Sequence, residues 1–208
     1  MQRYREAFRK KVIPSYYSGH VHVAFFIIFE LVTLFFIAPY VEWNLLSPIY
    51  ILIGLFYGST FTYFVHRFLL HSKIPGFKWA EKMHHWHHTF YPAYNMQYDH
   101  LSDIYMLFMP PWIQFLYFFV YSPILIFLLS FILPTAIVAH FAFAMILWYG
   151  IYEFAHWLEH RPANHFLMKF RPFAHIRHHH TVHHSKLQHE INFGIVETSW
   201  DYIFKTKL

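Results

Sequence analysis

The stretch SPIYILIGLFYGSTFTYFV, Ser47–Val65, decides the fold that we expect. It carries no charged residue, and His66 follows it directly. About 20 apolar residues in an α-helix cross the roughly 30 Å hydrocarbon core of a bilayer, so this stretch is long enough to span a membrane. The sequence therefore predicts a transmembrane helix with a histidine at its end.

Three further apolar runs surround this stretch. Val21–Pro39, VHVAFFIIFELVTLFFIAP, precedes it across the short loop 41–46, and together they predict a helical hairpin. Ile104–Tyr121 and Pro123–Tyr149 are also apolar enough to span, and we expect both to be kinked because prolines interrupt them. The predicted spans cover approximately residues 21–40, 47–65, 104–121 and 123–149, with residues 66–103 and 150–208 forming a helical cap.

The composition supports a membrane protein. The chain is 57% hydrophobic and 24% aromatic but only 13% charged, which is far from the balance of a soluble domain. No flexible linker, low-complexity tract or internal repeat divides it. We therefore expect one all-α, membrane-embedded domain over residues 1–208, built from four transmembrane helices and a cap.

The placement of the basic residues predicts the topology. All 16 lie within residues 3–11, 67–82 and 161–207, whereas residues 12–65 and 83–160 contain none. Short cytoplasmic segments of multi-pass membrane proteins collect Lys and Arg, so the net charge of +5 does not indicate nucleic-acid binding. An even number of spans separates the three stretches, which places both termini and the cap on the cytoplasmic side.

The 20 histidines are gathered in clusters. Because the chain has no cysteine, a metal site must use His, Asp or Glu. Spacings of three and four residues bring imidazoles to one helix face, and an adjacent histidine can point to a second centre. The clusters hold more imidazoles than one metal ion needs. They are HRFLLH (66–71), HHWHH (84–88), HWLEH (156–160) and HIRHHHTVHH (175–184).

Two alternatives apply to these histidines. A solvated basic patch, or a surface for anionic lipid headgroups, could also collect them, although four clusters with ligand spacing on one membrane face seldom arise by chance. Imidazole binds Fe, Zn, Cu and Ni, so the ligand type does not choose the metal. The isolated histidines are expected to be ordinary surface or core residues: His20, His22, His100, His140, His165 and His189.

The order of these motifs resembles the fatty acid hydroxylase superfamily, which includes fatty acid 2-hydroxylases, sterol desaturases and sterol methyl oxidases. HRFLLH matches the form H-x(3,4)-H, HHWHH contains H-x-x-H-H, and GIYEFAHWLEH resembles an element of the 2-hydroxylases. HTVHH, followed by NFGIVETSWDYIFKT, is similar to the closing motif of the family. The resemblance covers most of the chain and is closest in layout to the 2-hydroxylases.

The resemblance implies a set of site residues. It selects ten ligands for two metal ions and assigns no catalytic side chain beyond them. His175, His178 and His179 receive a lesser role, and whether they also bind metal is left open. The implied ligands are His66, His71, His84, His87, His88, His156, His160, His180, His183 and His184.

Two further groups of candidates surround these ligands. Residues that could lie behind the ligands and orient them are Glu153, Glu159, His175, His179 and Asp99. Aromatic residues that could line a substrate channel, with ordinary helix packing or lipid contact as the alternative for each, are Phe61, Phe64, Phe68, Trp86 and Tyr152.

The activity that the resemblance implies is hydroxylation of the alkyl chain of a membrane lipid, with two iron ions and O2 as co-substrate. Zinc can replace iron on overexpression. The sequence has no His-Pro-Gly-Gly haem motif, so we expect a separate electron donor of the reductase, cytochrome or ferredoxin type. The alternatives are a sterol desaturase or methyl oxidase, a carotenoid hydroxylase and, in a different class, a membrane metal-binding protein without catalysis.

Overall fold

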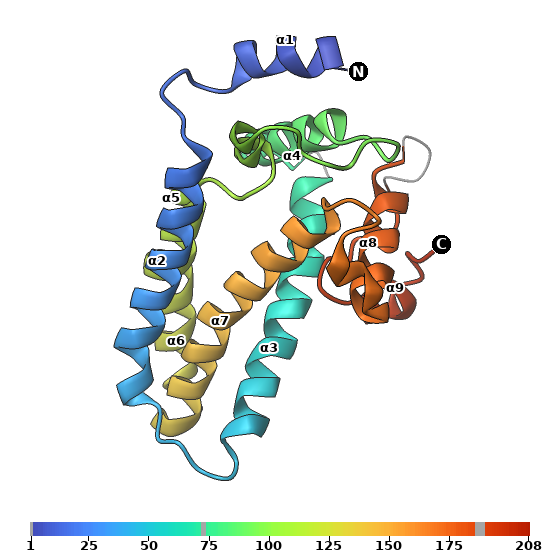
Figure 1. Cartoon of the computed structure of the whole chain (residues 1–208). Helices are drawn as coiled ribbons and strands as arrows, with labels where there is room; N and C mark the ends of the chain where they lie inside the picture. Colours follow the sequence, from blue (N-terminus) through green and yellow to red (C-terminus); the bar gives the residue numbers. More distant parts are fainter. Residues whose placement is uncertain (1, 72–73, 186–189) are drawn as a thin grey trace.

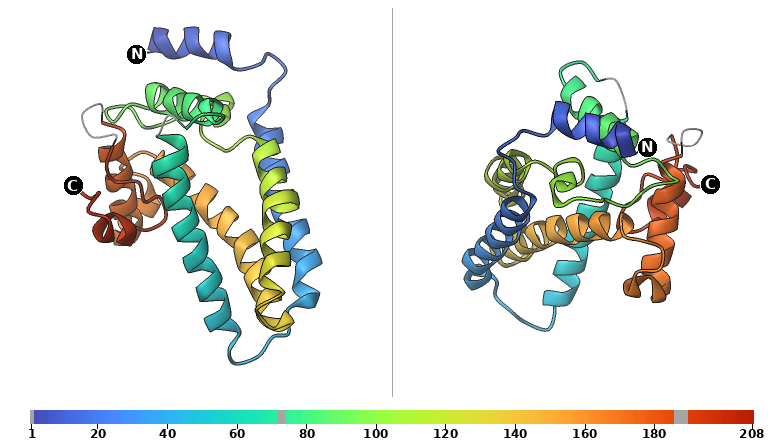
Figure 2. Two further views of the ribbon diagram at one scale, coloured as in Figure 1. Left: turned by 180° about the vertical axis from the view of Figure 1, so that it is seen from behind. Right: turned by 45° about the horizontal axis from the view of Figure 1, so that its top comes forward.

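The computed structural model describes residues 2–71, 74–185 and 190–208, and these residues form helices, turns and loops but no strand. The expected all-α fold class is therefore confirmed. His189 lies outside the described residues. Long helices stand side by side as a bundle, and short helices gather at one end of it (Figures 1 and 2).

The bundle supplies the membrane-spanning part of the protein. Four of its helical segments are long and apolar enough to cross a membrane, as expected for a membrane protein: Gly19–Tyr40, Ser47–Leu70, Pro111–Leu129 and Thr135–Glu159. The helices that build them are α2 (Gly19–Ile37), α3 (Ser47–Phe64), α5 (Pro111–Leu116), α6 (Ser122–Leu129) and α7 (Thr135–Glu159).

The boundaries of the last two spans differ from the sequence prediction. We expected spans at 104–121 and 123–149, whereas the structure has Pro111–Leu129 and Thr135–Glu159. Residues 101–106 form a separate 3-10 turn in the cap. The number of spans is thus correct, but both later spans begin several residues further along the chain.

The prolines explain this shift. Pro111 begins α5 instead of breaking a helix, because the N–H groups of a first turn have no partner within the helix and proline loses nothing there. Pro123 follows the π-helical turn Tyr117–Tyr121, whose longer hydrogen-bond spacing lets the helix continue past it. Pro134 directly precedes α7 and marks the boundary between the two spans.

Two glycines set the distance between α3 and α7. A Cβ atom on Gly54 would lie 2.5 Å from the Cβ of Ala144, and one on Gly58 would lie 2.3 Å from Cγ of Trp148. Small residues four positions apart allow close packing in a membrane, where tight packing contributes to helix association. This contact fixes the end of α3 relative to the end of α7, and both ends carry histidines.

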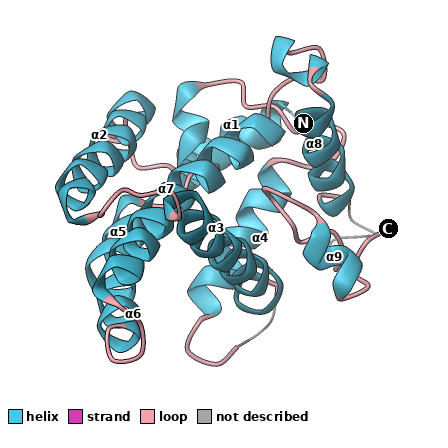
Figure 3. Cartoon of the chain, turned by 90° about the horizontal axis from the view of Figure 1, so that it is seen from below, coloured by secondary structure: helices cyan, strands magenta, loops and turns pink. Residues whose placement is uncertain are grey.

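A cap of short elements covers one end of the bundle. In Figure 1, α1 lies across α4 at the top. In the view along the bundle in Figure 3, α8 and α9 stand beside α3, on the side away from α2. The elements of the cap are α1 (Gln2–Val12), α4 (Lys78–Phe90), α8 (Arg171–His183) and α9 (Ser199–Ile203), with 3-10 turns at Leu101–Met106 and Phe166–Lys169.

Replacing Gly54 with valine is expected to destabilise the protein by roughly 1–3 kcal/mol, because the added side chain would overlap Ala144. Thermal unfolding in detergent measures the effect. Leu52→Ala, on an exposed face of the same helix, is the matched control and should leave the melting temperature nearly unchanged. Equal melting temperatures for wild type and Gly54→Val would contradict the close packing of α3 and α7.

Candidate metal centre

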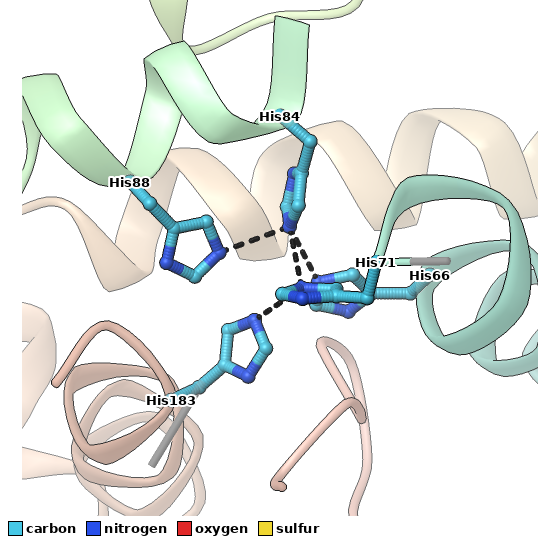
Figure 4. A group of neighbouring side chains, drawn as sticks. All are labelled: His66, His71, His84, His88 and His183. Carbon is cyan, nitrogen blue, oxygen red and sulfur yellow. Dashed lines mark hydrogen bonds between the residues drawn. The ribbon is translucent and has the colours of Figure 1, made fainter. Parts of the chain in front are cut away.

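The ten histidines that the sequence singled out converge beneath the cap, in two groups. Figure 4 shows the rings of one group meeting from α4, α8 and the end of the second span. In the first centre the ring nitrogens of five histidines lie within 4.8 Å of one another: His66, His71, His84, His88 and His183. In the second centre the same holds for four histidines: His87, His160, His180 and His184. His156 adjoins the second centre, with its Nε2 atom 3.2 Å from Nε2 of His87.

A π-helical turn brings His66 and His71 together. The two residues are five positions apart, which on an α-helix would separate their directions by about 140°. Val65–Leu70, which continues α3, is instead π-helical, and the two ring centroids lie 5.1 Å apart. The rule of three- and four-residue spacings did not predict this pair. A π-helical turn was the missing feature.

Each H-x-x-H-H motif serves both centres. On α4, His84 and His88 lie one helical turn apart and belong to the first centre, whereas His87 belongs to the second. The motif on α8 divides in the same way, with one histidine in the first centre and two in the second. Neighbouring residues of a helix project about 100° apart, so a pair of adjacent histidines can reach two ions.

Backbone carbonyls fix the protonation of five of these rings. A carbonyl oxygen only accepts, so the Nδ1 atom that contacts it must carry the proton. Nε2 of the same ring is then unprotonated, with its lone pair directed into the cluster. The pairs are His66 with Phe193 (2.6 Å), His87 with Met106 (2.7 Å), His160 with Met96 (2.7 Å), His183 with Ile191 (2.6 Å) and His184 with Tyr91 (2.5 Å).

The resulting contacts between Nε2 atoms fit a shared cation. His87 and His184 both donate through Nδ1, yet their Nε2 atoms lie 3.2 Å apart with no proton to share. Two lone pairs at that distance repel each other. Two nitrogens bound at right angles to one ion, each at 2.0–2.1 Å, would be about 3.0 Å apart. Across the two centres the Nε2 separations are 2.9 to 3.2 Å, so the donor set fits one metal ion in each.

Burial keeps the ligand rings neutral. Burial, together with neighbouring imidazoles, holds the pKa of most rings outside the spans well below the ordinary value of 6.5, and it lowers the pKa of His87 to about 4. Metal binds the neutral ring, so these ligands are ready at neutral pH. The rings whose pKa lies well below 6.5 are His84, His88, His160, His180, His183 and His184.

The metal-free protein is expected to lose stability as the pH falls below about 6.5, the ordinary histidine pKa. Below that value the unfolded chain binds protons that the folded chain, with its lowered pKa values, does not bind. Each such histidine then lowers the free energy of unfolding by up to about 1.4 kcal/mol per pH unit. Thermal unfolding of chelator-treated protein between about pH 7.5 and about pH 5 measures the slope. A flat profile would contradict the buried, neutral state of the rings.

Asp201 organises the loop behind the first centre. Its carboxylate accepts hydrogen bonds from the backbone N–H groups of Phe193 (2.9 Å) and Gly194 (2.7 Å), from the Thr206 hydroxyl (2.7 Å) and from Nε2 of His179 (2.9 Å). Burial raises the pKa of Asp201, but these hydrogen bonds outweigh it and hold the pKa below its ordinary value. The loop carries the carbonyls of residues 191 and 193 that orient two rings of the first centre.

Replacing Asp201 with alanine is expected to weaken metal binding at the first centre by about 10- to 100-fold, the usual effect of removing a group that orients ligands. Competition with a chelator, followed by metal analysis, measures it. Tyr202→Phe, at an exposed neighbouring position, is the control. If Asp201→Ala held both ions as tightly as wild type, the loop would not depend on this carboxylate.

The five residues predicted to lie behind the ligands have different surroundings. Oε2 of Glu159 lies 3.7 Å from Nδ1 of His180, and both side chains are fully buried. Glu153 instead accepts a hydrogen bond from the backbone N–H of Met109. The other three make their contacts elsewhere: His179 with Asp201, His175 with Thr198 and Asp99 with Arg5. His178 is exposed.

An apolar cavity of about 670 Å³ adjoins both centres. Its wall includes rings of the first centre (His66 and His84) and of the second centre (His87). Of the described residues, none of those lining it is Lys, Arg, Asp or Glu. Apolar residues of α2, α4 and α5, among them Phe25, Met83 and Trp112, form part of the remaining wall, and residues 105–110 form another part. Such a cavity fits an alkyl chain better than a charged ligand.

The channel residues predicted from sequence divide into two groups. Trp86 and Tyr152 line the cavity. Phe61 does not, and packs on the ring of Tyr121 with centroids 4.7 Å apart. Phe64 and Phe68 are also outside the wall, and both are partly exposed. The sequence does not predict the part of the wall that α2 and α5 form, because the apolar residues of these helices resemble ordinary membrane-facing residues.

A second, more polar cavity of about 740 Å³ lies on the cap side. Three ligands of the first centre line it, together with Tyr4 of α1 and Glu81 of α4. The centres are therefore bordered by an apolar space among the spans and by a polar one within the cap.

Taken together, four apolar spans and two histidine clusters describe a helical membrane protein whose clusters could each hold a metal ion. Comparison with protein-family models identifies a match to fatty acid hydroxylase over residues 51–206, which includes all ten histidines. The chain belongs to the fatty acid hydroxylase family.

One solved structure illustrates the shared fold. The chain is similar to full-length Scs7p, of which only the hydroxylase domain is visible, with a TM-score of 0.61 and 21% sequence identity. The match covers 88% of this chain and 64% of that one. No curated protein sequence matches the chain.

Proposed function

We propose that the protein is an O2-dependent di-iron oxygenase that hydroxylates the alkyl chain of a membrane lipid. The observation that carries the proposal is the pair of centres in which unprotonated Nε2 atoms face one another beside an apolar cavity. Membership of a family that uses iron supports this choice of metal over zinc. The proposed ligands are His66, His71, His84, His87, His88, His156, His160, His180, His183 and His184.

The division of work between metal and protein follows from the side chains present. Bound iron would supply the activation of O2 that attack on an unactivated C–H bond requires, because no side chain here can perform that chemistry. The protein holds the imidazoles neutral and correctly turned through backbone carbonyls. It also positions the alkyl chain, since rings of both centres form part of the cavity wall.

The cavity supports a substrate whose enclosed part is uncharged. An alkyl chain gains from burial against its apolar wall, whereas a carboxylate or phosphate there would find no cationic side chain among the described residues. Exposed apolar residues of the first span, such as Val21 and Phe25, also line the cavity, so a lipid chain can enter sideways from the bilayer. The polar headgroup would then remain outside.

The electron donor is proposed to approach the cap. Both histidine centres include residues of α4, which lies with α1 at one end of the bundle (Figure 1). The distribution of basic residues favours a cytoplasmic location for that end. Arg3, Lys10 and Lys11 are exposed on α1. A separate reductase, cytochrome or ferredoxin with an acidic surface fits this side.

Replacing His87 or His183 with alanine is expected to reduce lipid oxidation by about 100-fold or more, because each change removes a ligand from one centre. Mass spectrometry of lipids from cells that express each variant measures the product. His178→Ala, an exposed histidine of α8, is the matched control.

The same experiment separates the alternatives. A hydroxylated acyl chain supports the proposal, whereas a new sterol alkene or an oxidised carotenoid would assign the same site to another substrate. Metal-free protein should regain activity with ferrous ion and not with zinc. Tight metal binding without any O2-dependent product would instead identify a metal-binding protein that is not an enzyme.

A further inference from the structure

Arg5 of α1 is a fully buried cation outside the part of the chain that matches the family. Its guanidinium donates to the backbone carbonyls of Phe90 (3.1 Å), Asn95 (2.6 Å) and Gln97 (2.8 Å), and to the carboxylate of Asp99 (2.7 Å). Burial of a cation is costly unless hydrogen bonds replace its water. The last residue of α4 and the loop after it meet that requirement by turning three carbonyls towards one side chain.

The neighbouring carbonyls of the same loop point to the second centre. Phe90 C=O accepts from Arg5, and the next carbonyl, that of Tyr91, accepts from Nδ1 of His184. The carbonyl of Met96, between the Asn95 and Gln97 carbonyls that Arg5 holds, accepts from Nδ1 of His160 at 2.7 Å. The loop therefore binds Arg5 on one side and two ligand rings on the other.

Arg9, one turn further along α1, closes the other end of the loop. Its Nε and Nη2 atoms donate to the two carboxylate oxygens of Asp103 at 2.7 and 2.8 Å. The carbonyl of Asp103 accepts from the hydroxyl of Tyr91 at 2.9 Å. Phe8, on the same helix, packs on Phe90 with ring centroids 5.4 Å apart. The position of α1 is thus linked to the backbone that orients the ligands.

We propose that Arg5 is a positioning residue for the second metal centre, which it serves by holding the carbonyls of Tyr91 and Met96 against His184 and His160. This inference rests on the metal sites of the proposed function. We expect the first centre to be independent of Arg5, because two of its rings, His66 and His183, are oriented by the loop that Asp201 holds.

Lysine cannot replace Arg5 in this role. The planar guanidinium reaches three carbonyls and a carboxylate with N–H groups in a fixed fork, whereas an ammonium is a compact charge on a flexible stem. Arg5→Lys therefore keeps the charge and removes the geometry. Arg3→Lys is the matched control, because Arg3 is exposed on the same helix.

The test is chelator competition on full-length protein in detergent, loaded with ferrous ion under anaerobic conditions. Wild type and Arg3→Lys should hold two ions per chain, and Arg5→Lys should hold one of them about 10- to 100-fold more weakly. Equal retention of both ions by Arg5→Lys would overturn the inference, as would equal weakening of both. A wild-type protein that binds no metal would overturn the proposed function itself.

Double variants assign the weakened ion. With His184→Ala, which breaks the second centre, Arg5→Lys should leave the affinity of the remaining ion unchanged. With His71→Ala, which breaks the first centre, Arg5→Lys should weaken the remaining ion by the same 10- to 100-fold. The reverse pattern would overturn the inference. If Arg5→Lys does not fold, Arg9→Lys replaces it as the test, with a smaller expected loss of metal affinity at the second centre. An unchanged affinity in Arg9→Lys would then overturn the inference.

Discussion

The structure depends on one constraint: imidazoles that bind a metal through Nε2 must give the proton on Nδ1 to an acceptor. Five rings meet it with a backbone carbonyl, so the backbone around the site is as specific as the histidines themselves. Helices alone cannot provide these acceptors, because the carbonyls within them are already paired. The carbonyls therefore come from loops and helix ends, and buried side chains hold two of these segments in place.

The two centres are built on the same plan from different parts of the chain. A loop near the C-terminus orients rings of the first centre and is fixed by a buried carboxylate, Asp201. The loop after α4 orients rings of the second centre and is fixed by a buried guanidinium, Arg5. The charges are opposite because the first loop presents N–H groups to its anchor, whereas the second presents carbonyls.

Much of the fold and site could be predicted from the sequence, because the apolar runs and the histidine spacings record them directly. The positions of the last two spans could not, since Pro111 and Pro123 occur where a helix tolerates proline, and residue type alone does not reveal that. The sequence places Arg5 in the basic stretch 3–11, which favours a cytoplasmic location. No local pattern distinguishes the burial of Arg5 from the exposure of Arg3. Tertiary contacts with residues 90–99 make the difference.

The π-helical turn after α3 has a consequence for how the first motif can vary. A π turn is an α-helical turn with one additional residue accommodated in it. Where a related chain has H-x(3)-H, an ordinary α turn places both imidazoles on one side. Where it has four intervening residues, as between His66 and His71, the wider turn absorbs the extra one. Insertion or deletion of a single residue at this point can therefore leave both imidazoles facing the same cluster, so the motif tolerates two lengths.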